Sequence, residues 1–123
     1  DIVLITYGAM VHTALEAADA LAGDGLELEV IDLRSLVPLD WETIRESVHR
    51  INKVIILHED VRTGGMGGEI AAVIAEKAFD ALDGPIVRIT APDTPVPYSP
   101  PLEDAFIPQS ADVVAAARRL VEY

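Results

Sequence analysis

Four short apolar runs, separated by segments with helical periodicity, constrain the fold of this chain more than any other feature. Residues 2–7 (IVLITY) are almost continuously apolar and rich in β-branched side chains, which is typical of a strand buried on both faces. Further strands are predicted at residues 26–32, 53–58 and 86–90. Helices are predicted at residues 9–22, after Asp40, at 69–82 and at 111–121. The order βαβαβαβα predicts an α/β domain with a mostly parallel sheet and helices on both faces.

Helical spacing also predicts which side chains face the core. In residues 9–22 the inward row is Val11, Leu15, Ala18 and Leu21, and Asp40 is expected to cap the second helix. The corresponding rows of the other helices are Trp41, Ile44 and Val48; Ile70, Val73, Ile74 and Ala78; and, after an N-cap at Ser110, Val113, Val114, Ala117 and Leu120. Residues 91–109 contain six prolines, which predicts an extended loop.

Charge and residue usage exclude several functions. The chain has 123 residues, with 9 Lys and Arg against 21 Asp and Glu, so its formal net charge is -12. This charge repels phosphate backbones, so nucleic acid and membranes are not expected partners; it favours solubility or attraction to a basic protein. The chain has no cysteine and begins at Asp1 rather than Met. We therefore expect a single domain at residues 1–123 that is a fragment of a larger subunit, without disulfides or thiolate metal sites.

The stretch HEDVRTGGMGGE (residues 58–69) combines a polar strand end with four glycines in five positions. Ile70 stands where a dinucleotide fingerprint counted from Gly65 requires glycine, and Glu69 stands where a Walker loop requires lysine. An acid/base role of His58 and Glu59 is geometrically possible, but adjacent strand residues point to opposite faces and make poor metal co-ligands. The interpretation that the residues favour is a strand-to-helix turn that holds the loop or contacts a neighbouring subunit.

Four motifs, taken in order, resemble the C-terminal domain of the transketolase family. They are ITYGAMVHTALEAA, VIDLRSLVPLDWETI, VIILHEDVRTGGMGGEIAAVIAE and APDTPVPYSPPLEDAFIP. The closest likeness is to the beta subunit of thiamine-diphosphate-dependent 2-oxo acid dehydrogenases. The resemblance implies a three-layer α/β/α sandwich with a five-stranded sheet, one strand antiparallel. The residues themselves indicate four strands, so we expect four or five, and a fifth would precede Asp1 or be one that the pattern does not reveal.

The resemblance also implies a function within a larger enzyme. The parent subunit would oxidatively decarboxylate a 2-oxo acid with thiamine diphosphate and magnesium, neither of which this domain alone is expected to bind. Expected partners are a second beta subunit, an alpha subunit and a dihydrolipoyl acyltransferase core, in a bacterial cytoplasm or a mitochondrial matrix. The domain's own task would be subunit association and docking; the alternative is a regulatory domain of another transketolase-like enzyme that binds an anion or small molecule. The residues expected at an interface are Tyr7, Gly8, His12, His58, Glu59, Arg62, Gly64, Gly65, Met66, Gly67, Glu69 and the terminal Tyr123.

Overall fold

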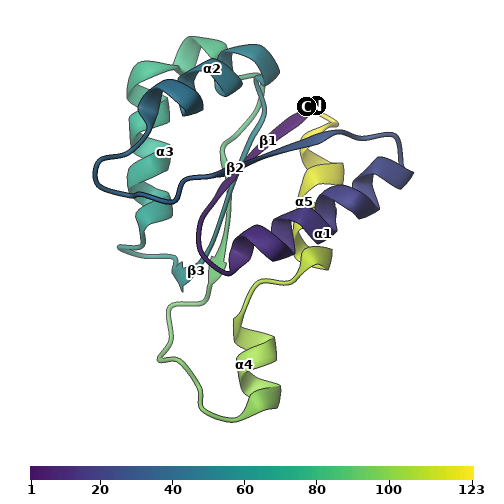
Figure 1. Cartoon of the computed structure of the whole chain (residues 1–123), viewed down its shortest axis with the longest axis vertical. Helices are drawn as coiled ribbons and strands as arrows, with labels where there is room; N and C mark the ends of the chain where they lie inside the picture. The colour runs from purple at the N-terminus through teal and green to yellow at the C-terminus, as the bar shows by residue number, and fades with distance from the viewer.

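The computed structural model describes all residues, 1–123, as one α/β domain in three layers (Figure 1). The strands pair in the order β2-β1-β3-β4, and every pair is parallel. The elements are β1 (Ile2–Thr6), α1 (Met10–Gly23), β2 (Leu28–Asp32), α2 (Trp41–Ile51), β3 (Val54–Val61), α3 (Met66–Lys77), a 3-10 turn η1 (Phe79–Ala81), β4 (Val87–Ala91), α4 (Pro100–Phe106) and α5 (Ser110–Leu120).

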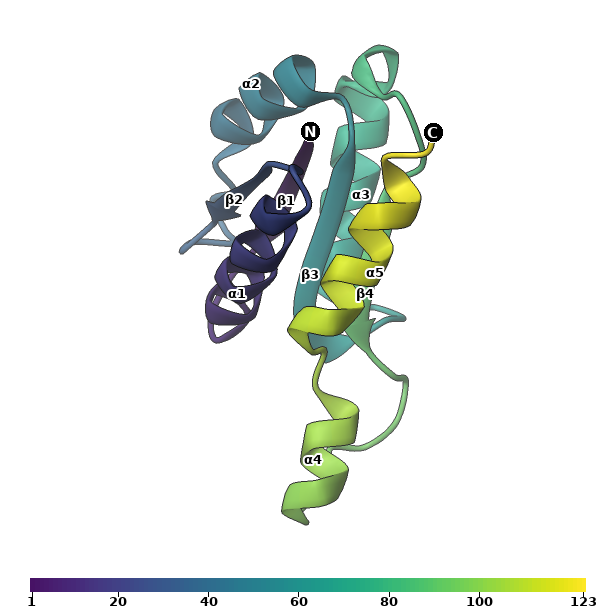
Figure 2. The same ribbon diagram turned by 90° about the vertical axis from the view of Figure 1, so that its right-hand side faces the viewer.

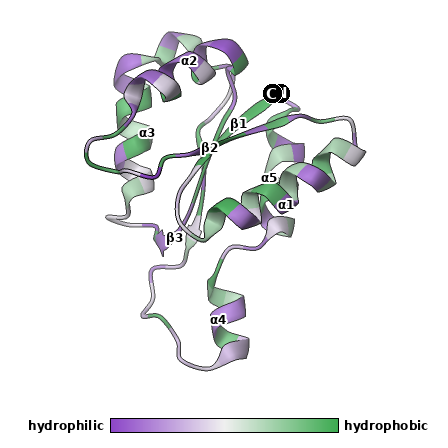
Figure 3. Cartoon of the chain, viewed as in Figure 1, coloured by the Kyte–Doolittle hydropathy of each residue, from purple (hydrophilic) through white to green (hydrophobic).

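Alternation along the central strands builds two separate cores. Ile2 and Leu4 of β1 face α1 and α5, whereas Val3 and Ile5 face α2 and α3. Figure 2 shows the two helix pairs on opposite sides of the sheet, and Figure 3 shows the mainly hydrophobic β1 between them. The sandwich and the parallel sheet are as predicted. The fifth, antiparallel strand of the resemblance is not formed by residues 1–123, so β2 and β4 are both edge strands.

The buried face of α1 differs from the predicted one by one residue. Met10, Ala14, Ala17 and Leu21 are buried, whereas Leu15 is 49% exposed. The reason lies in the neighbouring helix: α1 packs against α5, whose buried residues include Ala116 and Ala117. Alanines on both helices allow a close approach that a row containing Leu15 would prevent. In α1, therefore, Leu15 of the periodic pattern is exposed, while the smaller Ala14 and Ala17 are buried.

The prediction of an unbroken loop at residues 91–109 was wrong, because α4 lies within it. Pro100 and Pro101 occupy the first positions of this helix, where proline lacks no needed hydrogen bond and its fixed φ suits the first turn. Both views show α4 extending beyond the body of the domain (Figures 1 and 2). Val96, Tyr98 and Leu102 of this segment are exposed.

Two element boundaries matter for the glycine turn. β3 continues to Val61, three residues beyond the predicted end, and α3 begins at Met66, three residues before the predicted start. Gly67 and Gly68 therefore belong to the first turn of the helix, and the connection between strand and helix is only residues 62–65. At the other helix starts, Asp40 caps α2 as predicted, but Gln109 rather than Ser110 caps α5. No helix of the model has the combined length and apolar character that a membrane span requires.

Candidate functional site

The carboxyl ends of the four strands lie at one end of the sheet, where parallel α/β domains usually bind their ligands or partners. Two of the predicted site residues meet there directly. The rings of Tyr7, after β1, and His58, in β3, are stacked with 6.1 Å between centroids and 25° between planes. Both side chains lie on the face covered by α2 and α3, in line with Ile5 and Ile56, which are register partners.

His58 is fully buried, and neither ring nitrogen has a hydrogen-bond partner. This position differs from the expected exposed polar edge. Burial lowers the pKa of His58; the charge of Asp60 and an interaction with the backbone of Asp60 oppose this, while the charge of Arg88 acts in the same direction as burial. The ring is therefore neutral at physiological pH. A buried His58 beside an exposed Glu59 on the opposite face does not support an acid/base pair of these two residues.

The glycines of the turn have an intramolecular role. A Cβ atom on Gly67 would overlap Nε2 and Cδ2 of His58, and one on Gly65 would overlap the carbonyl oxygen of Val61. Gly64 differs, because its φ of +81° favours glycine while the space around it is open. Two of the glycines thus accommodate the chain's own His58 and β3 rather than leaving room for another chain.

Tyr7 is half-buried above His58. Burial raises the pKa of its hydroxyl, and the charges of Asp60 and Glu59 raise it further. His12, Glu59, Asp60 and Glu69 are exposed around this centre. No group of three or more His, Asp or Glu side chains in residues 1–123 is placed to hold a metal ion. The carboxyl end of the sheet therefore has an acidic, exposed rim around the half-buried Tyr7 and the buried His58.

The turn is attached to β4 and to the loop that follows it. Arg62 donates from Nη1 to the carbonyl oxygen of Arg88 at 2.9 Å, and Nη1 of Arg88 donates to the carbonyl oxygen of Arg62 at 3.4 Å. The Asp93 carboxylate accepts hydrogen bonds from the Thr63 amide at 2.8 Å and the Thr63 hydroxyl at 2.6 Å. These hydrogen bonds lower the pKa of Asp93. Arg88 and Asp93 could not be assigned to the turn from sequence, because they lie about thirty residues away with no motif of their own.

Comparison with known proteins agrees with this geometry. The family model described as "Transketolase, C-terminal domain" matches residues 1–113. The chain belongs to the transketolase C-terminal domain family.

Relatives of this transketolase C-terminal domain include beta subunits of several oxidoreductases. The acetoin:2,6-dichlorophenolindophenol oxidoreductase subunit beta of Cupriavidus necator is 44% identical over 122 residues, covering 99% of this chain and 36% of the relative. The pyruvate dehydrogenase E1 component subunit beta of Bacillus subtilis is 41% identical over 123 residues, covering 100% and 38%. Related beta subunits include bacterial and mitochondrial forms. The chain thus spans little more than a third of the length of these relatives.

A solved structure described as a split-gene transketolase, an inactive beta4 tetramer, superposes on this transketolase C-terminal domain with a TM-score of 0.84. It is 30% identical in sequence, and the match covers 99% of this chain and 38% of that one. The family fold therefore extends over essentially the whole of this chain.

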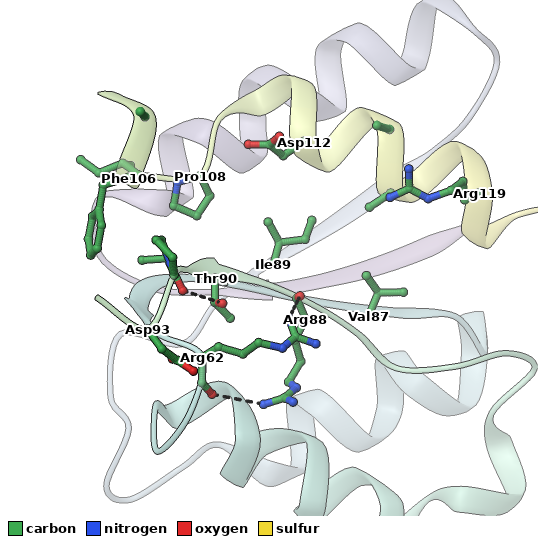
Figure 4. A pocket seen from close by; sticks show the side chains of 16 residues that line it. Arg62, Val87, Arg88, Ile89, Thr90, Asp93, Phe106, Pro108, Asp112 and Arg119 are labelled. Atoms are coloured by element: carbon green, nitrogen blue, oxygen red, sulfur yellow. Dashed lines mark hydrogen bonds between the residues drawn. The ribbon is translucent and has the colours of Figure 1, made fainter. Parts of the chain in front are cut away.

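A groove of about 680 Å³ runs along the open edge of β4 in this transketolase C-terminal domain (Figure 4). Arg62 and Arg88 lie on one side of the strand, whereas Asp112 and Arg119 project from α5 on the other. The sequence pattern predicts Arg62 as a site residue but gives no indication of Arg88 or Arg119. Only the pairing of β3 with β4 brings Arg88 beside the turn.

Tyr123 is separated from the other predicted site residues. Its ring packs near Gly84, with its Cβ 3.5 Å from the point where a Gly84 Cβ would lie, and the residue is 74% exposed. Figures 1 and 2 place both chain ends at the amino end of the sheet, opposite the turn. The predicted residues therefore form two groups at opposite ends of the domain.

Proposed function

We propose that this domain is the C-terminal part of the beta subunit of a thiamine-diphosphate-dependent 2-oxo acid dehydrogenase. The observation that carries the proposal is identity above 40% over essentially the whole chain to subunits named as beta subunits of acetoin and pyruvate oxidoreductases. The parent enzyme would decarboxylate a 2-oxo acid oxidatively and pass the acyl group to a lipoyl arm. Acetoin is a hydroxyketone rather than a 2-oxo acid, so the relatives named for pyruvate and 2-oxoisovalerate dehydrogenases support the 2-oxo acid class, and we leave the particular acid open. A bacterial cytoplasm or a mitochondrial matrix is the corresponding location.

The residues of this domain do not fit the cofactor. Magnesium bound to a diphosphate needs clustered oxygen ligands, and residues 1–123 contain no group of three or more carboxylates or histidines placed for a metal. We therefore assign thiamine diphosphate and magnesium to other parts of the parent enzyme. This domain's contribution would be structural, through contacts with neighbouring chains.

For the beta–beta contact we propose the surface at the carboxyl ends of β1 and β3. The exposed candidates there are Gly8, His12, Glu59, Arg62, Gly64 and Glu69. Tyr7, Met66 and the buried His58, Gly65 and Gly67 would support this surface from beneath rather than line it. A two-fold contact brings the same patch of both copies together. A charged residue near the axis therefore lies beside the same residue of the other copy.

For docking to an acyltransferase core we propose the opposite end, around the exposed Tyr123. The net charge of -12 supports a basic module as the partner, because long-range attraction accelerates encounter and selects for opposite charge. An alpha subunit would complete the heterotetramer. The two contacts use different surfaces, so they can be tested separately.

The oligomeric state tests the first contact. We expect a dimer by multi-angle light scattering at tens of micromolar. His12→Glu, which adds a carboxylate to the proposed patch, should raise the dimer dissociation constant about tenfold, because two introduced anions would face each other. His49→Glu makes the same change on the exposed surface of α2 and should have no effect. A wild-type monomer, or equal effects of the two variants, would count against this contact.

The coding sequence upstream of Asp1 tests the parent enzyme. The proposal expects a pyrimidine-binding domain of the thiamine type there. The complete subunit, co-purified with its alpha subunit, should show 2-oxo-acid-dependent reduction of an acceptor dye that requires added thiamine diphosphate and magnesium. An upstream domain of another fold would refute the assignment, whatever the oligomeric state of residues 1–123.

A further inference from the structure

Unpaired arginines gather beside β4 in an otherwise acidic domain. Five of the nine Lys and Arg side chains form ion pairs with carboxylates: Arg34, Arg45, Arg50, Lys53 and Arg118. The three arginines in no ion pair, Arg62, Arg88 and Arg119, all line the groove along β4. A chain with a net charge of -12 thus leaves its free guanidinium groups at one place.

Two of these arginines also line a second hollow, of about 470 Å³, at the start of α3. Each guanidinium uses one N–H on the other's backbone carbonyl, which leaves four of its five donors free. The Arg88 guanidinium lies against the first turn of the helix, with Nη1 3.5 Å from the point where a Gly68 Cβ would be. This distance is ordinary van der Waals contact, so the guanidinium packs directly on the helix.

Gly64, Gly65 and Gly68 of the turn also line this hollow. The amides of residues 64 to 67 donate no hydrogen bond within the chain, as expected for the residues that begin a helix, and Gly65 provides no side-chain cap. The positive end of the α3 dipole adds to the attraction for an anion. Glu69 is the opposing group, because its carboxylate lines the hollow too.

A buried side chain lies beneath this turn, outside the lining of the hollow. His58 is completely buried, its Nε2 edge faces Gly67, and neither of its nitrogens has a partner. Buried polar groups are nearly always hydrogen-bonded in folded proteins. His58 is not among the residues that line the hollow, so it positions the first turn of α3 and does not itself contact the anion.

We propose that Arg62, Arg88 and the amides at the start of α3 bind a small oxyanion, a phosphate or a carboxylate. Two guanidinium groups beside free amides match the several oxygen acceptors of either group. The glycine spacing still argues against a nucleotide loop; it is the pairing of β3 with β4 that supplies the charges. This proposal goes beyond subunit association and does not depend on it.

Amide NMR of the full chain tests the site. Sodium phosphate and sodium succinate are titrated separately at pH 7.5, with sodium chloride holding the ionic strength constant. We expect saturable shifts of the amides of residues 64–68. Arg62→Gln and Arg88→Gln should each weaken binding about tenfold or more, because each removes charge-assisted hydrogen bonds. Glu69→Gln should strengthen binding several-fold by removing the opposing charge. The tighter of the two anions identifies the ligand class.

Arg34→Gln is the matched control, because it removes the same charge from a side chain that is 87% exposed and remote from α3. It should leave the affinity unchanged. Equal binding by wild type, Arg34→Gln and Arg88→Gln, or shifts that chloride reproduces, would overturn the proposal. Thermal unfolding of each variant verifies folding, and light scattering on the same samples separates loss of the anion from loss of a dimer.

Discussion

The imidazole ring of His58 lies so close beneath Gly67 that the glycine has no room for a Cβ atom. The first turn of α3 therefore sits directly on the end of β3, and the glycine-rich sequence has a cause inside the chain. Close packing of this kind cannot relax without moving the helix or the ring. A side chain introduced at position 67 therefore meets the His58 ring directly.

Gly67→Ala should lower the free energy of unfolding by about 1–3 kcal/mol, the usual cost of forcing extra atoms into a packed site. Urea denaturation followed by circular dichroism measures this change. Gly23→Ala is the control, since a Cβ there meets nothing within 4 Å, and it should be neutral or stabilising by up to about 1 kcal/mol. If the ring is the obstacle, Gly67→Ala should cost less in a His58→Ala background.

The buried His58 should make stability depend on pH. Its folded-state pKa lies below the unfolded value of 6.5, so below pH 6.5 the unfolded chain binds the proton more readily than the folded one. The stability it contributes is complete above pH 6.5 and is lost as the pH falls toward the folded pKa. For one titrating group, the free energy of unfolding cannot change by more than about 1.4 kcal/mol per pH unit.

His58→Leu should remove that part of the slope, which urea titrations between pH 5 and pH 8 would show. The leucine has no polar atom to leave unsatisfied, so the variant should also be close to wild type in stability at pH 7.5. His12→Gln replaces an exposed histidine and should keep the slope. An unchanged slope in His58→Leu would contradict the buried, neutral assignment.

Asp93 should hold the turn after β3 in place, since both of its carboxylate oxygens accept hydrogen bonds from Thr63. Asp93→Ala should accelerate hydrogen exchange of the Thr63 amide, measured by NMR, while amides in the centre of β3 stay protected. Because its pKa is lowered, wild-type protection should persist above pH 3.8 and disappear only at lower pH, as Asp93 becomes protonated. Asp104→Ala, at another exposed carboxylate, should leave Thr63 unaffected.

The observed face of α1 can be tested by two opposite substitutions. Leu15→Gln, on the exposed side, should change the free energy of unfolding by less than about 0.5 kcal/mol. Ala17→Leu, on the side packed against α5, should cost about 1–3 kcal/mol through overpacking. The face that the sequence pattern predicts requires the reverse order, so thermal or urea unfolding of these two variants separates the alternatives.

The sequence sufficed for the architecture because each strand is an uninterrupted apolar run and each crossover has helical spacing. It failed where contacts between distant segments decide. Ala14 and Ala17 are buried instead of Leu15 because of α5, and Pro100 initiates a helix instead of breaking one. Arg88 lacks any local motif, and only strand pairing places it beside Arg62. Tyr7 and His58 were both selected as site residues, but their stacking and the complete burial of His58 follow from tertiary packing.

The two ends of the sheet carry different proposed contacts, and this separation has a mechanical consequence. One partner at the Gly64 turn and another at Tyr123 would not compete for space, so the domain can bind both at once. Between them run β1 and β3, whose core residues are fully buried. The sheet would then be a rigid spacer with one partner bound at each end. The length of its central strands would fix the distance between the two partners.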